Sequence, residues 1–147
     1  MSFATIRDEL ERLYGRVRAG ASADAFDRFQ VRYSVRLPDD LKASYSLMDG
    51  ADDSTNPGGS WMRFWPIHEF VPAKDKPRAA RDDGRKLFVF ADYAIACVYY
   101  VVDLRPGSGS FGHVHALGAT RVTEVAQTFA EFVQLVLANS DKLHTYS

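Results

Sequence analysis

The chain has 147 residues, the usual size of one domain and long enough to bury a core without disulfide bridges. Hydrophobic residues make up 46% and charged residues 25%, a composition that excludes an intrinsically disordered chain. The formal charge is −1, from 18 basic and 19 acidic residues, so the charge of the whole molecule gives no reason to expect nucleic acid or an anionic membrane as a partner. We expect a single domain over residues 1–147 that contacts neither nucleic acid nor a membrane directly.

The first residues and the one cysteine indicate the compartment. The N-terminal stretch MSFATIRDELERL lacks the basic start and apolar block of a signal peptide. The most apolar window, residues 87–102, is interrupted by Asp92 and is shorter than the roughly 20 residues that span a bilayer. Cys97 lies in an apolar run and cannot form an internal disulfide. A cytoplasmic protein is therefore expected.

Two amphipathic helices are predicted at the start of the chain. Apolar residues recur at helical spacing, so we expect a helix from about residue 2 to residue 18, with a buried face made of Phe3, Ile6, Leu10, Leu13, Tyr14 and Val17. Gly20 is expected to end it in the left-handed conformation. Ser22 or Asp24 should cap a second helix, whose apolar face is predicted to be Phe26, Phe29, Val31 and Tyr33.

The stretch RLPDDLKASYSLMDG, residues 36–50, has the residue order of a short capped helix. Pro38 suits the first helical position, where an N–H would have no partner, and Asp39 and Asp40 place negative charge at the positive end of the helix dipole. Gly50 suits the position just past the last turn. The buried stripe of this third helix is predicted to be Leu41, Tyr45 and Met48.

A β half follows a polar loop. Residues 51–60, ADDSTNPGGS, are dense in turn formers and are expected to be exposed. Strands are predicted at residues 61–65, 87–91, 93–103, 113–117 and 120–125, in a largely antiparallel sheet. Between them we expect a turn or short second piece at 67–71, a surface connection at 74–86, a turn at Asp92 and a hairpin connection at 105–112. The apolar stretches 87–91 and 93–103 are typical of central strands covered on both faces.

The chain ends with another predicted helix. Thr128 and Glu131 have the spacing of a capping box, in which a hydroxyl and a carboxylate each accept a backbone N–H near the helix start. Asn139 is a suitable helix end. The predicted fold class is therefore α+β, with N-terminal helices and a C-terminal helix packed on a mostly antiparallel sheet.

These elements occur in the order of a known family. The segments LPDDLKASYSLMDG, WMRFWPIHEF, FVFADYA and TFAEFVQLVL resemble the SUKH superfamily, over about residues 24–138. Part of its name refers to fungal cell-wall-synthesis regulators of the Smi and Knr type, and it covers many bacterial proteins thought to be immunity proteins against polymorphic toxins. The most specific match is made by Leu37, Pro38, Asp40, Leu41, Lys42 and Gly50. Leu41 and Asp49 stand where the family commonly has Tyr and Asn.

The resemblance implies a protein that binds another protein, with no catalytic residues and no cofactor. Its partner is expected to be a cognate toxin domain, which an immunity protein occludes by surface complementarity. An intracellular regulatory or scaffold protein with a resident partner is the alternative, and an isolated gene, away from any large secreted toxin, would favour it. The chain is expected to be a monomer or a weak dimer.

Acidic and aromatic side chains are the candidate partner-binding residues. Residues 37–60 carry five Asp and one Lys, and if the toxin is a nuclease its basic cleft would be met by Asp39, Asp40, Asp49, Asp52 and Asp53. Tryptophan and tyrosine are enriched in interfaces. The aromatic candidates, unless they pack inside, are Trp61, Trp65 and Tyr99.

A third hypothesis, from a different class, is a small metal-dependent hydrolase. His113 and His115 alternate in a predicted strand, which places both side chains on one face about 7 Å apart. They could share a metal if His68 or an acid supplied a third ligand, and Asp103 is the further candidate residue. Because two ligands are too few, we expect ordinary surface or interface histidines and no metal site.

Overall fold

The computed structural model describes residues 2–14, 17–51, 62–76, 86–93, 98–118 and 122–144. Within these ranges the chain forms an α+β fold of four α-helices and a six-stranded antiparallel sheet, which confirms the predicted fold class. The helices are α1 (Phe3–Tyr14), α2 (Ala23–Tyr33), α3 (Asp39–Tyr45) and α4 (Phe129–Leu137). Three 3-10 turns accompany them in the same described ranges, η2 (Ile67–Glu69), η3 (Ala73–Asp75) and η4 (Asp141–His144).

The sheet has the strand order β1-β3-β4-β5-β6, and β2 also pairs with β3. The bounds are β1 (Met62–Phe64), β2 (Val71–Pro72), β3 (Leu87–Tyr93), β4 (Val98–Asp103), β5 (Val114–Leu117) and β6 (Val122–Ala126). The near-continuous apolar strands β3 and β4 are central, as predicted.

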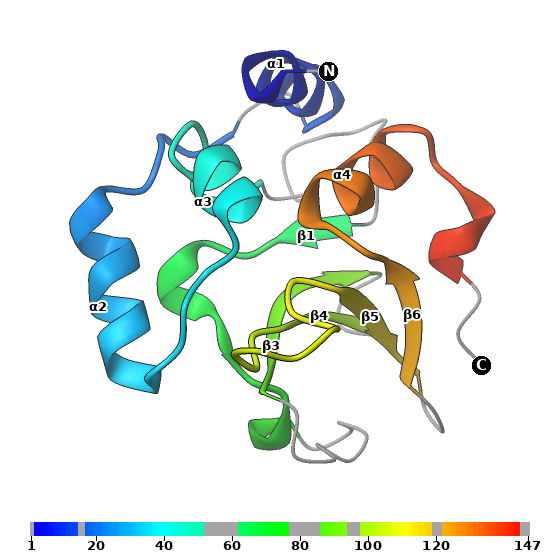
Figure 1. The fold of residues 1–147 in the computed structure, drawn as a ribbon. Helices are drawn as coiled ribbons and strands as arrows, with labels where there is room; N and C mark the ends of the chain where they lie inside the picture. Colours follow the sequence, from blue (N-terminus) through cyan, green and yellow to red (C-terminus); the bar gives the residue numbers. More distant parts are fainter. Residues whose placement is uncertain are drawn as a thin grey trace.

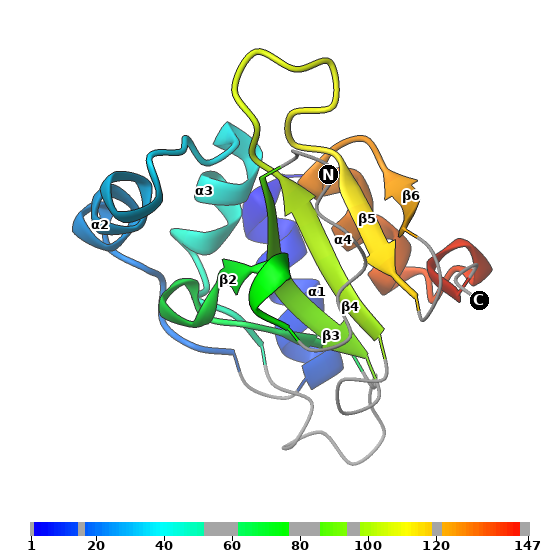
Figure 2. The same ribbon diagram turned by 90° about the horizontal axis from the view of Figure 1, so that it is seen from below.

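The helices are stacked in two levels on one face of the sheet. Figure 1 shows α3 and α4 between the sheet and α1, while α2 lies at the side of the molecule. Seen from below, the sheet lies in front of α1, and the turn η3 crosses β3 on the face turned away from the helices (Figure 2). We call this second face of the sheet the far face.

Aromatic rings hold α4 to the sheet. The ring of Phe90 lies 5.2 Å from that of Phe132 and 5.7 Å from that of Phe129, and all three side chains are buried. Phe64 of β1 contacts the same two α4 rings at 6.0 and 6.5 Å. Such edge-on aromatic pairs contribute beyond the area that they bury, so they fix the position of α4 over β1 and β3.

The start of the chain differs from the prediction in two ways. Helix α1 ends at Tyr14 because Val17 is extended and forms an antiparallel bridge with Ala51, not a further helical turn. Gly20 does not have the left-handed conformation. A Cβ at this position would lie 1.9 Å from the carbonyl oxygen of Ser46, so glycine is needed for close approach of two backbone segments.

Helix α2 follows the prediction at its start and departs from it on its apolar face. The Ser22 hydroxyl accepts the Ala25 N–H at 3.1 Å, so Ser22 is the cap. Phe26 and Phe29 are buried. Val31 was predicted to share their face, but it is 80% exposed. It lies two positions after Phe29, which is about 200° around the helix axis, so it points away from the core.

Asp92 lies inside β3 and does not form the predicted turn. It pairs with Tyr99 across β3 and β4 and is only 7% exposed. The buried carboxylate accepts the indole N–H of Trp65 at 2.6 Å. A hydrogen-bond donor makes a buried carboxylate tolerable within a strand, and the donor lies too far along the chain for local spacing to reveal it.

Most of the remaining predicted elements are confirmed with small shifts. Of the loop predicted to be exposed at 51–60, only Ala51 lies within the described residues, and it is buried and bridged to Val17 and Phe64. Of the surface connection predicted at 74–86, residues 77–85 lie outside the described residues. Residues 105–112 connect β4 to β5, and Pro38 stands at the start of α3.

Asn139 ends the last helix with a φ of +49°, as predicted. Gly50 also has a positive φ, +92°, but it does not end α3, which stops at Tyr45 with Ser46 as its cap. A Cβ at Gly50 would lie 2.7 Å from the carbonyl oxygen of Phe64, so glycine is needed there for close approach of two backbone segments. Thr128 accepts the Glu131 N–H at 3.0 Å. None of the described helices is long and apolar enough to cross a membrane.

Candidate functional site

Two of the candidate aspartates are engaged in holding the fold. Asp40 accepts the N–H of Ala130 at 2.9 Å and so caps α4 from α3. Asp49 accepts the N–H of Ile67 at 2.8 Å and so fixes the start of η2. Asp39 is different, because its side chain is 89% exposed and pairs only loosely with Lys42, at 3.8 Å. Asp52 and Asp53 lie outside the described residues. Among the described acids of the predicted strip, Asp39 is the one that faces solvent.

Tyr45 is fixed beside these aspartates. Its hydroxyl donates to the carbonyl oxygen of Trp65 at 2.7 Å, and its ring is buried. Burial raises the pKa of the phenol well above its ordinary value, and the nearby Asp49 carboxylate raises the pKa further. The phenol is therefore neutral and acts as a hydrogen-bond donor within the scaffold.

The aromatic candidates meet two cations on the far face of the sheet. The Trp65 and Tyr99 rings lie 6.1 Å apart in an edge-on arrangement. The ammonium of Lys76 lies 4.9 Å from the centre of the Trp65 ring and 5.6 Å from that of the Tyr99 ring. Arg63 approaches Trp65 at 5.8 Å. We call Arg63, Trp65, Lys76 and Tyr99 the aromatic–cation cluster.

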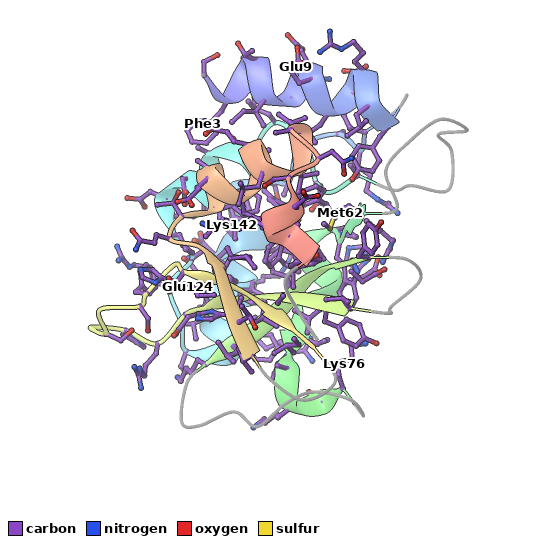
Figure 3. The ribbon with its side chains drawn as sticks, turned by 90° about the vertical axis from the view of Figure 1, so that its right-hand side faces the viewer. Phe3, Glu9, Met62, Lys76, Glu124 and Lys142 are labelled. Carbon is purple, nitrogen blue, oxygen red and sulfur yellow. The ribbon has the colours of Figure 1, made fainter. Side chains whose placement is uncertain are left out.

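Strand pairing explains why these residues gather. Arg63, Asp92 and Tyr99 are successive partners across β1, β3 and β4, so their side chains share one face of the sheet. Lys76 follows η3, which crosses that face. Figure 3 shows Lys76 at the end of the molecule opposite to Glu9, which points outward from α1. The cluster is therefore separated from the helical levels by the sheet.

Hydrogen bonds and ion pairs hold the base of the cluster rigid. Both carboxylate oxygens of Glu69 lie 3.1 Å from one guanidinium nitrogen of Arg63. Trp65 is 6% exposed and anchored through its N–H to Asp92, whereas Tyr99 is half-buried. The cluster therefore offers a partner an amphipathic tyrosine ring beside the cation of Lys76. Trp61, the other aromatic candidate, lies outside the described residues.

A groove beside α2 escaped the sequence analysis. It has a volume of about 610 Å³ and a largely apolar lining that includes Ala25, Val31, Tyr33, Ile67, His68 and Phe70. The signal was present in the sequence, because a helical projection of α2 places Val31 opposite Phe29. The apolar character of Val31 alone suggested a core position.

The histidines do not assemble as the metal hypothesis required, and His115 is buried, not at the surface as expected. His113 lies 2.5 Å from Glu124 through Nδ1, and His115 lies 3.9 Å from the same carboxylate oxygen through Nε2. His68 is on η2 at the groove beside α2. In the part of the chain that the structure describes, no group of three or more His, Cys, Asp or Glu side chains could hold a metal ion.

Asp103, the remaining residue of the hydrolase hypothesis, organises the connection between β4 and β5. It is fully buried, and its two carboxylate oxygens accept the Arg105 N–H at 2.9 Å and the Ser110 hydroxyl at 2.8 Å. These bonds lie within one turn of chain, so they shape the hairpin loop.

Comparison with known proteins gives a family. A search of curated proteins found no match to this chain. The model of the SMI1 / KNR4 family (SUKH-1) matches residues 20–135, a range that runs from just before α2 into α4 and contains every residue of the aromatic–cation cluster. Since this range covers most of the 147 residues, the chain belongs to the SMI1 / KNR4 family (SUKH-1).

Proposed function

We propose that the protein binds another protein without catalysing a reaction, and that it acts as an immunity protein by occluding a cognate toxin domain. Membership of the SUKH-1 family, whose members are often toxin-immunity proteins, is the observation that carries the proposal. An inhibitor of this kind needs a preformed surface, since each side chain that binding immobilises lowers the affinity.

The aromatic–cation cluster is the surface that we assign to the toxin. Tyrosine, tryptophan and arginine are the side chains that most often dominate binding energy at interfaces. Trp65 is fixed by Asp92 and packs against Tyr99, so Tyr99 is held in place before a partner arrives. Little rotational freedom of that ring would be lost on binding.

The acidic candidates that are not engaged in the fold, as far as the structure describes them, are assigned a separate role in the approach of the toxin. Asp39, together with Asp52 and Asp53, would attract a basic toxin cleft over long range, which raises the association rate at low salt. Asp40 and Asp49 are excluded from this role, because their carboxylates already accept backbone N–H groups.

The test is protection of cells that express the toxin encoded beside this gene. Co-expression of the wild-type protein should restore growth, and absence of protection would refute the immunity role. Tyr99→Ala should weaken toxin binding by at least tenfold, mainly through faster dissociation, because a buried contact is lost. Tyr93→Ala is the matched control, since Tyr93 is also half-buried but is the next residue after Asp92 and so points to the other face of β3.

The two roles can be separated by kinetics. Replacing Asp39, Asp52 and Asp53 by Asn should lower the association rate at low salt and leave the dissociation rate nearly unchanged. Equal loss of binding for the Tyr99 and Tyr93 variants would remove the aromatic–cation cluster from the proposal while leaving the immunity role intact.

A further inference from the structure

Lys76 brings to the aromatic–cation cluster a positive charge that no described carboxylate pairs with. Its ammonium lies 4.9 Å from the centre of the Trp65 ring and 5.6 Å from that of the Tyr99 ring, and the residue is half-buried. The backbone N–H of Lys76 donates to the carbonyl oxygen of Ala73 at 3.0 Å, which fixes the residue at the end of η3. The charge is therefore held in a defined position against two rings.

The acids around Lys76 are engaged elsewhere or face solvent. The buried Asp92 carboxylate accepts the indole N–H of the cluster at 2.6 Å. Both carboxylate oxygens of Glu69 lie 3.1 Å from one guanidinium nitrogen of Arg63. Asp75, the residue before Lys76, is exposed, and in the part of the chain that the structure describes no ion pair includes Lys76. The ammonium is thus stabilised by the two rings and by solvent alone.

A partner that buries Tyr99 must also cover this ammonium. The two groups are 5.6 Å apart, so a protein surface lying on the Tyr99 ring removes water from both. An ammonium that loses its water and gains no acceptor opposes binding more strongly than one ring contact favours it. The rings offset only part of that loss, because a ring face attracts a cation more weakly than a carboxylate does. A neutral or basic toxin surface would therefore bind poorly at this place.

We propose that the toxin presents a carboxylate side chain to Lys76, beside an apolar side chain that packs on Tyr99. The inference rests on the proposed function, and it names the chemistry of the toxin at the contact. The ammonium has three N–H donors, so it can bind a carboxylate on the side that faces away from the rings. Because the rings already hold the ammonium, little freedom is lost when the ion pair forms.

This contact is opposite in sign to the long-range attraction that we assigned to Asp39. The toxin should carry a basic region, which speeds the approach, and an acid at the contact with Lys76, which slows dissociation. The ion pair would also reject a toxin that has lysine or arginine at the contact, so it supplies selectivity among toxins. Variants at the two places should therefore differ in their binding kinetics.

Surface plasmon resonance with a catalytically inactive form of the toxin domain encoded beside this gene tests the contact. Lys76→Met nearly keeps the length of the side chain and removes its charge, so binding should weaken by about 30-fold or more, mainly through faster dissociation. Lys76→Glu should weaken binding further, since two carboxylates would face each other. Lys76→Arg keeps a cation over the rings and should retain binding within about tenfold. A Lys76→Met variant that binds like the wild-type chain would overturn the inference.

Lys74 provides the matched control, because it is an exposed lysine within the same turn, η3, and none of the described rings lies beneath it. Lys74→Met and Lys74→Glu should change Kd by less than about threefold. Equal losses at the two lysines would overturn the inference and leave the immunity role intact. A wild-type chain that does not bind the toxin refutes the proposed function and the inference with it. Urea denaturation of each variant checks that a lost contact, not a lost fold, is measured.

A compensating substitution identifies the toxin acid. Each exposed Asp and Glu of the toxin domain is replaced in turn by Lys, and binding to Lys76→Glu is measured. One replacement should restore binding to this variant by about tenfold or more. The same replacement should weaken binding to the wild-type chain, because it sets two cations against each other. Rescue by none of the replacements would contradict a direct ion pair.

Discussion

Helices α2 and α3 follow each other in the chain, and each carries two aspartates in its first half. The surroundings of these aspartates differ between the two helices. Asp24 and Asp27 of α2 are exposed. In α3, Asp39 is exposed, whereas Asp40 accepts the N–H of Ala130 and thereby joins α3 to α4. The same residue type near a helix start can therefore remain exposed in one helix and hold the scaffold in the next. Substitutions in the two helices should separate these roles.

The largest effect is expected where the chain just before α2 touches the chain just after α3. Gly20→Ala would place a Cβ 1.9 Å from the carbonyl oxygen of Ser46, just after α3, so one of the two backbone segments must move. We expect a loss of about 3 kcal/mol or more in the free energy of unfolding, measured by urea denaturation. Gly109→Ala is the control, because a Cβ there meets no atom within 4 Å, and its effect should be small.

Asp40→Ala should have the next largest effect. It removes the carboxylate that caps α4 through the Ala130 N–H, and loss of such a cap costs about 1–2 kcal/mol. Urea denaturation of Asp39→Ala gives the matched comparison, since this neighbouring aspartate is exposed and its loss should cost about 0.5 kcal/mol or less. Equal losses for the two variants would mean that Asp40 does not link α3 to α4 in solution.

Tyr45→Phe should have a smaller effect that depends on pH. Loss of the hydrogen bond to the Trp65 carbonyl should cost about 1 kcal/mol at neutral pH. Burial raises the pKa of Tyr45, so the unfolded chain releases this proton first, above about pH 10. The stability that the neutral phenol contributes is complete below that pH and is lost as the pH rises through the raised pKa.

The pH effect can be isolated by comparing two chains. Denaturation of the wild-type protein and of Tyr45→Phe at successive pH values should show their difference in stability shrinking above about pH 10, since phenylalanine does not titrate. A difference that stays constant into the alkaline range would contradict a buried, proton-bearing Tyr45.

The smallest effect on stability is expected for α2. Val31→Ala removes an exposed side chain and introduces a better helix former, so the free energy of unfolding of the dilute protein should change by no more than about 0.5 kcal/mol. Thermal or urea unfolding at low concentration measures this. A large loss would show that Val31 packs within one chain.

Local patterns were sufficient for most of the scaffold. Spacing and capping residues predicted α3 and the Thr128 cap of α4, because these features depend on residues within one or two turns. Asp92 and Gly20 were misread, since their surroundings are set by Trp65 and Ser46, which lie about 26 residues away in the sequence and become neighbours only in the fold.

The candidate site was less accessible from the sequence. Composition selected Trp65 and Tyr99, but not Lys76, whose position over both rings depends on η3 crossing the far face of the sheet. The five candidate aspartates looked equivalent in the sequence. The different surroundings of the three described ones, Asp39, Asp40 and Asp49, follow from which backbone N–H groups the fold brings close, and no local spacing contains that information.

The bond between Asp40 and Ala130 also bears on how the protein folds. Its two residues are 90 positions apart, so the start of α4 gains its tertiary cap only after the chain has closed a very large loop. During synthesis, α3 would leave the ribosome long before the residues that it caps. Closure of the helical layer should therefore be a late step, governed by long-range contacts and slower than the formation of either helix alone.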